Sequence, residues 1–146
     1  MMRTLAAALL AICIAGPAMA DADASIKYRK NAMKAVGSQM GSIVAILKGE
    51  VDNKDALATH AALMGAATKM AITKPAFMPN TDGQGSEKTT AIGAIWSDWA
   101  KFEEGLMALE KAGQAMADAG ANASFDQVKA LGAACKSCHK AFRVKK

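Results

Sequence analysis

The residues with the clearest chemistry lie close to the C-terminus, where Cys135, Cys138 and His139 form a Cys-x-x-Cys-His motif. This spacing is typical of the attachment site of a c-type haem. The two thiols add to the two vinyl groups on one edge of the porphyrin, and the imidazole that follows is a usual ligand of haem iron. The motif therefore predicts one haem c per chain, attached through both cysteines, with His139 as the proximal ligand.

Three other uses of these cysteines are weaker. A zinc site would need a second pair of ligands, but the other histidine is His60, and the third cysteine, Cys13, lies in a segment that we expect to be removed. A thioredoxin-like redox pair would need a βαβ context, and the sequence has no strand-like alternation. A structural disulfide is the third alternative, and haem attachment is the favoured interpretation.

The N-terminal segment has the composition of a secretory signal. Arg3 is followed by the apolar residues 5–15, and small residues precede the expected cut before Asp21. We therefore divide the chain into a signal peptide (1–20) and one domain (21–146). An uncleaved membrane anchor is the alternative, but the apolar run is short for a membrane span. Bacterial c-type haem is attached outside the cytoplasmic membrane, so we expect a periplasmic protein with no membrane association after cleavage.

The formal net charge is +5 at pH 7, with positive charge concentrated in residues 27–34 and 136–146. These two clusters could steer an acidic protein partner, although an ordinary solvated surface is the simpler interpretation. The charge does not require a nucleic-acid partner.

The rest of the chain reads as four amphipathic helices. Ile26, Met33, Met40 and Leu47 recur every seven residues, as on one face of a helix. Turn-forming residues fill 73–88. We expect helices over residues 24–48, from 52 or 53 to about 72, from 87–90 to about 120, and from 124 onward. Short links between them predict an all-α fold, an antiparallel up-down four-helix bundle.

The last helix should carry the motif towards the bundle interior. Ser124 and Gln127 form a capping-box pattern at its start. The apolar stripe that follows includes both cysteines: Phe125, Val128, Leu131, Cys135, Cys138 and Phe142. The haem is therefore expected in the core, against the other helices. On the third helix, Trp96, Trp99 and Phe102 either flank this flat cofactor or are ordinary core residues.

The haem motif at the C-terminus of a four-helix chain resembles cytochrome c′ and the other class II cytochromes c. Three stretches carry the resemblance, and together they span the mature chain: 26–30 with Met33, 95–98 with Phe102, and 135–143. The resemblance implies that Arg29 lies by a haem propionate, with Lys30 and Glu87 as weaker candidates.

The resemblance also implies positions on the two faces of the haem. Arg143 would lie beside the proximal face, and Met33 would face the distal side of the iron. In the high-spin branch of the family the distal site is open and binds nitric oxide or carbon monoxide. In the low-spin branch a methionine sulfur fills it. Met33 permits either state, and we favour ligation by a narrow margin.

Electron transfer to a redox partner protein is the leading functional hypothesis, and binding of a diatomic gas is the alternative. Peroxidase chemistry would need a distal histidine, and His60 has no partnering motif, so we expect no enzymatic activity and assign no catalytic residues. Dimerisation through the first two helices is usual in the family and compatible with Gly37, Gly41 and the alanine-rich second helix.

Overall fold

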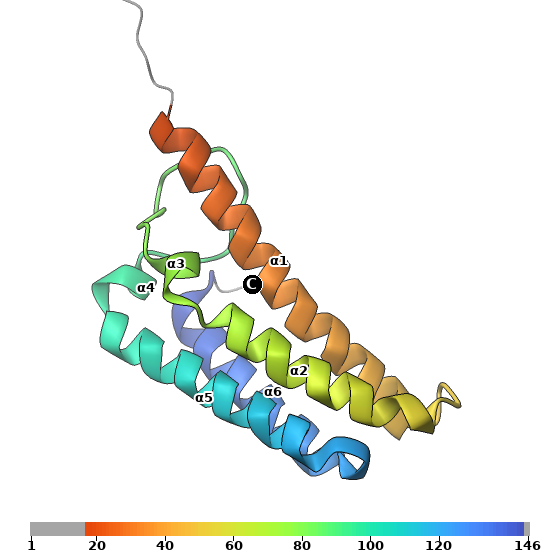
Figure 1. Cartoon of the computed structure of the whole chain (residues 1–146). Helices are drawn as coiled ribbons and strands as arrows, with labels where there is room; N and C mark the ends of the chain where they lie inside the picture. The colour runs from red at the N-terminus through yellow and green to blue at the C-terminus, as the bar shows by residue number, and fades with distance from the viewer. Residues whose placement is uncertain (1–16, 145–146) are drawn as a thin grey trace, which may run out of the picture.

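Residues 17–144 are described by a computed structural model, and four long helices dominate them (Figure 1). The helices are α1 (Pro17–Leu47), α2 (Leu57–Ala71), α3 (Lys74–Phe77), α4 (Ala94–Ser97), α5 (Trp99–Ala119) and α6 (Phe125–Phe142), with 3-10 turns at Lys54–Ala56 and Gly120–Asn122. Contacts run from α1 to α2, α2 to α5, α5 to α6, and less extensively from α6 back to α1. The expected antiparallel four-helix bundle is confirmed.

The long helix α1 turns a stripe of residues spaced three or four apart towards the interior. Ile26, Val36 and Ile43 are buried on it. Met33 and Met40, which the seven-residue repeat placed at the centre of the stripe, are instead half-buried at its edge. A helix has 3.6 residues per turn, so a strict repeat of seven drifts around its axis.

Small residues let α2 and α5 approach closely. A Cβ atom added at Gly113 would overlap the buried Thr68 side chain, and one added at Gly65 would lie 2.8 Å from Ala117 Cβ. The Thr68 hydroxyl is satisfied within its own helix, where it bonds to carbonyl oxygens one turn back. The close approach of this pair therefore depends on the absence of two side chains.

The segment before α4 is extended rather than helical. Helix was expected to begin at 87–90, and that prediction is wrong, because α4 begins at Ala94 and α5 begins only after a break at Asp98. Residues 86–92, which we call the strap, are held by other parts of the chain. Asp23 accepts from backbone N–H groups at the start of the strap, and Ile92 N–H donates to Phe142 at its end. These tertiary bonds outweigh local helix propensity.

The start of α6 is built as the sequence predicted. Ser124 and Gln127 form the capping box, in which Gln127 Oε1 accepts from Ser124 N–H at 2.9 Å. Leu131 and Phe142 are buried, whereas Phe125, expected on the same stripe, is 41% exposed.

Within residues 17–144, no helix is both long enough and apolar enough to cross a membrane. Residues 1–16, most of the predicted signal peptide, lie outside the described residues.

Candidate haem site

The motif residues lie on α6, with both thiols turned partly into the bundle. Cys135 packs at the edge of the bundle core, and Cys138 packs against a cluster that includes Phe102 and Phe142. Both cysteines are free and half-buried. Burial raises the pKa of each thiol, and the nearby Cys135 raises the pKa of Cys138 further. Redox-active cysteines ordinarily have lowered pKa values, so this geometry does not favour a thioredoxin-like pair.

A metal site of protein ligands alone is not formed around the motif. Structural zinc takes four ligands, and nowhere in residues 17–144 do three or more His, Cys, Asp or Glu side chains gather with metal-binding geometry. His60, the other histidine, lies on α2, and its Nδ1 is 2.8 Å from Gln39 Oε1 on α1.

Two cavities open beside the motif, one of about 410 Å³ and one of about 270 Å³. Met33, Cys138 and His139 line both. Two of these residues come from α6, and Met33 reaches the same place from α1. The larger volume lies within the range of small-molecule and cofactor sites in proteins, about 300–1,000 Å³, and the smaller one lies just below it.

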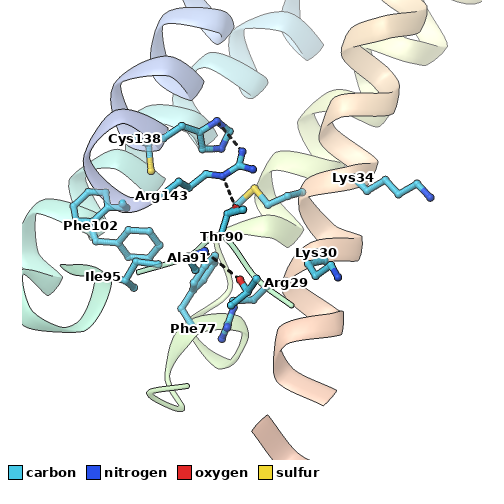
Figure 2. Close-up of a pocket in the computed structure, with 14 residues that line it drawn as sticks. Arg29, Lys30, Lys34, Phe77, Thr90, Ala91, Ile95, Phe102, Cys138 and Arg143 are labelled. Carbon is cyan, nitrogen blue, oxygen red and sulfur yellow. Dashed lines mark hydrogen bonds between the residues drawn. The ribbon is translucent and has the colours of Figure 1, made fainter. Parts of the chain in front are cut away.

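The larger cavity combines an apolar wall with a positive rim (Figure 2). Its apolar residues are Phe77, Ala91, Ile95, Phe102 and Phe142, and its cations are Arg29, Lys30, Lys34 and Arg143. No Asp or Glu lines it. An apolar wall beside cations fits a flat aromatic group that carries carboxylates, because the ring is buried while the anions meet positive charge.

Arg29 is a buried cation at the end of this cavity. Its side chain is 4% exposed, and it donates to Ala76 O at 3.3 Å and to Thr81 Oγ1 at 2.6 Å. The guanidinium lies 5.6 Å from the ring centres of both Phe77 and Trp96. Burial lowers its pKa below the ordinary value, but an arginine stays charged. Arg29 therefore lines the cavity while it holds the 76–81 segment against α1.

Lys30 and Glu87, both predicted to contact the cofactor, pair with each other. The Lys30 ammonium forms a salt bridge with Glu87 and donates to Lys88 O at 3.2 Å. Lys27 Nζ lies 4.0 Å from the same carboxylate. Lys30 lines the larger cavity, whereas Glu87 lines neither cavity. Glu87 is therefore brought to α1 rather than to the cavity wall.

His139 lies at the mouth of the site beside Arg143. Arg143 Nη1 is 3.5 Å from His139 Nδ1, and Arg143 Nε donates to Thr90 Oγ1 at 2.9 Å. Partial burial lowers the pKa of His139, and the positive charge of Arg143 lowers it further. The imidazole is therefore kept in its neutral form, which is the form that ligates a metal.

Glycines make room for the smaller cavity. Gly37, Gly105 and Gly132 line it together with Met40. A Cβ atom at Gly105 would lie 3.4 Å from Cys138 Sγ, so the absent side chain leaves space beside that sulfur. Gly37 has no atoms within 4 Å of its missing Cβ position, which leaves this part of α1 open to the cavity.

Comparison with known proteins identifies the family of the chain. A family model described as Cytochrome C′ matches residues 24–143. The chain belongs to the cytochrome c′ family. Cytochrome c′ of Cereibacter sphaeroides is 34% identical over 150 residues, an alignment that covers 100% of both chains. Cytochrome c-556 of Agrobacterium fabrum is also 34% identical, over 99% of this chain and 97% of its own.

Solved cytochrome c′ structures have the same fold. Cytochrome c′ from Rhodobacter Spheriodes superimposes with a TM-score of 0.74 at 30% identity, over 86% of this chain and 98% of its own. A single-residue variant of the Alcaligenes xylosoxidans protein, in complex with nitric oxide, gives a TM-score of 0.70 at 25% identity, over 85% and 97%.

As a member of the cytochrome c′ family, the chain carries haem c attached through Cys135 and Cys138. The described residues fit that group. Both thiols are half-buried beside cavities of adequate size, an imidazole follows them, and the larger cavity has an apolar wall with cations and no carboxylates.

The sequence did not assign Thr81 or Thr90 to this cytochrome c′ site, and it left the role of Trp96 open. Each of these three side chains forms a hydrogen bond with a residue far away in the sequence. Thr90 accepts from Arg143, Thr81 accepts from Arg29, and Trp96 Nε1 donates to Phe77 O at 2.7 Å. Trp99 and Phe102 join Phe77 and Phe142 in an aromatic cluster. Sequence analysis left open whether Trp96, Trp99 and Phe102 flank the haem or belong to the core. Phe102 is buried in the core and also lines the larger cavity, whereas the two tryptophans line neither cavity.

Proposed function

We propose that this protein is a periplasmic electron carrier, with His139 as the proximal ligand of its haem iron and Met33 as the distal ligand. When bound, the haem supplies an iron that takes up and releases one electron. The observation that carries the proposal is that both cavities share three lining residues, Met33, Cys138 and His139. These are an attachment thiol and two side chains able to ligate iron, contributed by facing helices.

Met33 has the properties of a distal ligand. Its side chain is half-buried at the edge of the core rather than fully packed, so the thioether keeps room to move.

Arg29 is proposed to bind a haem propionate, and Arg143 to lie on the proximal side beside His139. Arg29 is fixed by its bonds to the 76–81 segment, and Arg143 is fixed by Thr90, so each presents its charge without further ordering cost. Lys30 contributes more weakly to propionate binding because it is already paired with Glu87. Glu87 acts through Lys30 rather than by touching the cofactor.

An enzymatic role is not proposed. Peroxide chemistry needs a general acid–base group near the iron, and His60 lines neither cavity while its ring bonds to Gln39.

The exposed Lys34 and Lys140 lie on α1 and α6, the helices that frame the site. They support an acidic redox partner, since such charges accelerate association.

The exposed Leu63 and Met70 of α2 support a homodimer.

The second candidate function is gas binding. It is favoured by the nitric oxide complex of the similar Alcaligenes xylosoxidans variant. In this alternative Met33 walls an open distal site without ligating the iron, and the protein binds nitric oxide or carbon monoxide there.

The substitution Met33→Ala separates the two candidates. If Met33 is a ligand, the variant turns from low-spin to high-spin, its reduction potential falls because a thioether favours ferrous iron, and it binds carbon monoxide quickly. Met107→Ala, which removes a 55% exposed methionine on α5, is the matched control and should change nothing. A wild type that is already high-spin, with a spectrum that Met33→Ala leaves unchanged, would rule out ligation.

A further inference from the structure

The C-terminal end of α6 carries a cation whose position depends on the strap. Arg143 Nη1 lies 3.5 Å from His139 Nδ1, while Arg143 Nε donates to Thr90 Oγ1 at 2.9 Å (Figure 2). Arg143 is exposed, and a free arginine side chain can adopt many rotamers. The hydrogen bond to the Thr90 hydroxyl keeps this otherwise mobile guanidinium beside the imidazole.

Thr90 is itself fixed by backbone bonds that do not use its hydroxyl. Val144 N–H donates to Thr90 O at 2.8 Å, and Ile92 N–H donates to Phe142 O at 3.3 Å. At the other end of the strap, Asp23 accepts from Glu87 N–H at 2.7 Å. Removal of the hydroxyl alone should therefore leave the strap in place and free only the arginine.

The pairing of His139 with Arg143 is unusual for a metal-binding histidine. The ring nitrogen that does not bind the metal ordinarily donates to a carboxylate, a carbonyl or water, which makes the ligand more basic. Beside Nδ1 of His139 lies a guanidinium, which has five donors and no acceptor. A fixed positive charge there makes the imidazole a poorer electron donor and favours the state of the haem with one more electron.

We propose that Thr90 is a positioning residue for the proximal side of the haem: its hydroxyl holds Arg143 against His139 and thereby raises the reduction potential. The inference rests on the proposed role of His139 as proximal ligand. It assigns to the strap a function beyond closing the cavity.

The test is the reduction potential of the haem-loaded protein, measured by spectroelectrochemical titration. Thr90→Val should lower the potential by an amount equal to about a three- to tenfold change in the ferric-to-ferrous equilibrium. Thr90→Ser, which keeps the hydroxyl, should restore it. Arg143→Ala should lower the potential as well, and Thr90→Val added to Arg143→Ala should have no further effect, as expected for two residues that act as one unit.

Thr59→Val, an exposed threonine on α2, is the control and should leave the potential unchanged. An unchanged potential in Thr90→Val, a failure of Thr90→Ser to restore it, or an undiminished effect in the Arg143→Ala background would each overturn the proposal. The absorption spectrum of haem-loaded His139→Ala separates this failure from a failure of the proposed function. If loss of the imidazole leaves the haem spectrum unchanged, His139 is not the proximal ligand, whereas a changed spectrum with no shift of potential in Thr90→Val overturns only the role of Thr90.

Discussion

Cys135 and Cys138 lie three residues apart on one side of α6, half-buried and with pKa values raised by burial. Such thiols are protonated and unreactive at neutral pH, so within the folded chain they have no evident redox chemistry of their own. Their placement fits the covalent attachment of haem c, which the chain carries as a member of the cytochrome c′ family.

Replacing both cysteines, as Cys135→Ala with Cys138→Ala, should therefore give protein that loses its haem to acidified organic solvent. The reason is that only covalent bonds survive denaturation of the protein. The measurement is the absorbance that remains with the precipitated chain. Cys13→Ala is the matched control and should keep its haem. Retention of the haem by the double variant would contradict the assignment.

Asp23 is the residue through which pH should act on the strap. Its pKa is lowered from an ordinary value of 3.8, first by the hydrogen bond from Glu87 N–H and then by the Ser86 hydroxyl. A carboxylate with a lowered folded-state pKa contributes stability above its unfolded-state pKa and loses that contribution as the pH falls through the folded-state value.

Wild type should therefore be more stable than Asp23→Ala at pH 6. The difference should begin to shrink near pH 3.8 and be lost as the pH falls through the lower folded-state pKa. Denaturant unfolding at several pH values measures this. Asp21→Ala, an exposed neighbour, should show no such difference. A gap between wild type and Asp23→Ala that persists unchanged at the acid end would mean that the carboxylate is not the group that titrates.

Among individual residues, the sequence predicted those whose partners lie nearby in the chain. Cys135, Cys138 and His139 carry their chemistry in their spacing. Asp23 lies within α1 and binds the strap, which comes more than sixty residues later in the chain. Such a pairing depends on how the helices are arranged in space, and no local pattern encodes it.

Among the helices, the contact of α2 with α5 is the one most dependent on small residues. Gly113 lies against the buried Thr68 side chain. Gly113→Ala should lower the free energy of unfolding by about 1–3 kcal/mol, since overpacking forces the helices apart. This cost exceeds the gain of about 1 kcal/mol from replacing a helical glycine.

Gly41→Ala is the matched control for that substitution, because no atom lies within 4 Å of its missing Cβ position. It should raise the free energy of unfolding by about 0.5–1 kcal/mol. Chemical denaturation of both variants tests the pair, and a stabilising effect of Gly113→Ala would show that the α2–α5 contact is looser than described.

The elements themselves were largely predictable, but the short helix α3 was not expected within the turn segment 73–88, and the start of the third long helix, which concerns the site, was misplaced. The capping box at Ser124 and the turn at Gly49 mark helix ends by local chemistry. The start of the third long helix was misplaced because residues 87–92 have no local signal that excludes helix, and their extended form is fixed by Asp23 and Phe142.

For the whole molecule, the bundle brings α1 and α6 together around the two cavities. A cut after Ala20 would keep every described contact of Asp23 and Arg29. Intact-mass measurement of the haem-bearing protein should therefore give a chain that begins at Asp21. A haem-bearing chain that still starts at Met1 would favour the membrane-anchor alternative.

The measurement that tests the central claim most directly is the absorption spectrum of the wild-type protein in its oxidised and reduced forms. An electron carrier with His139 and Met33 on the two faces of the haem should be low-spin in both forms. The oxidised spectrum should show the methionine-to-iron charge-transfer band. A high-spin spectrum without that band would contradict the account and identify the protein as a gas-binding cytochrome c′.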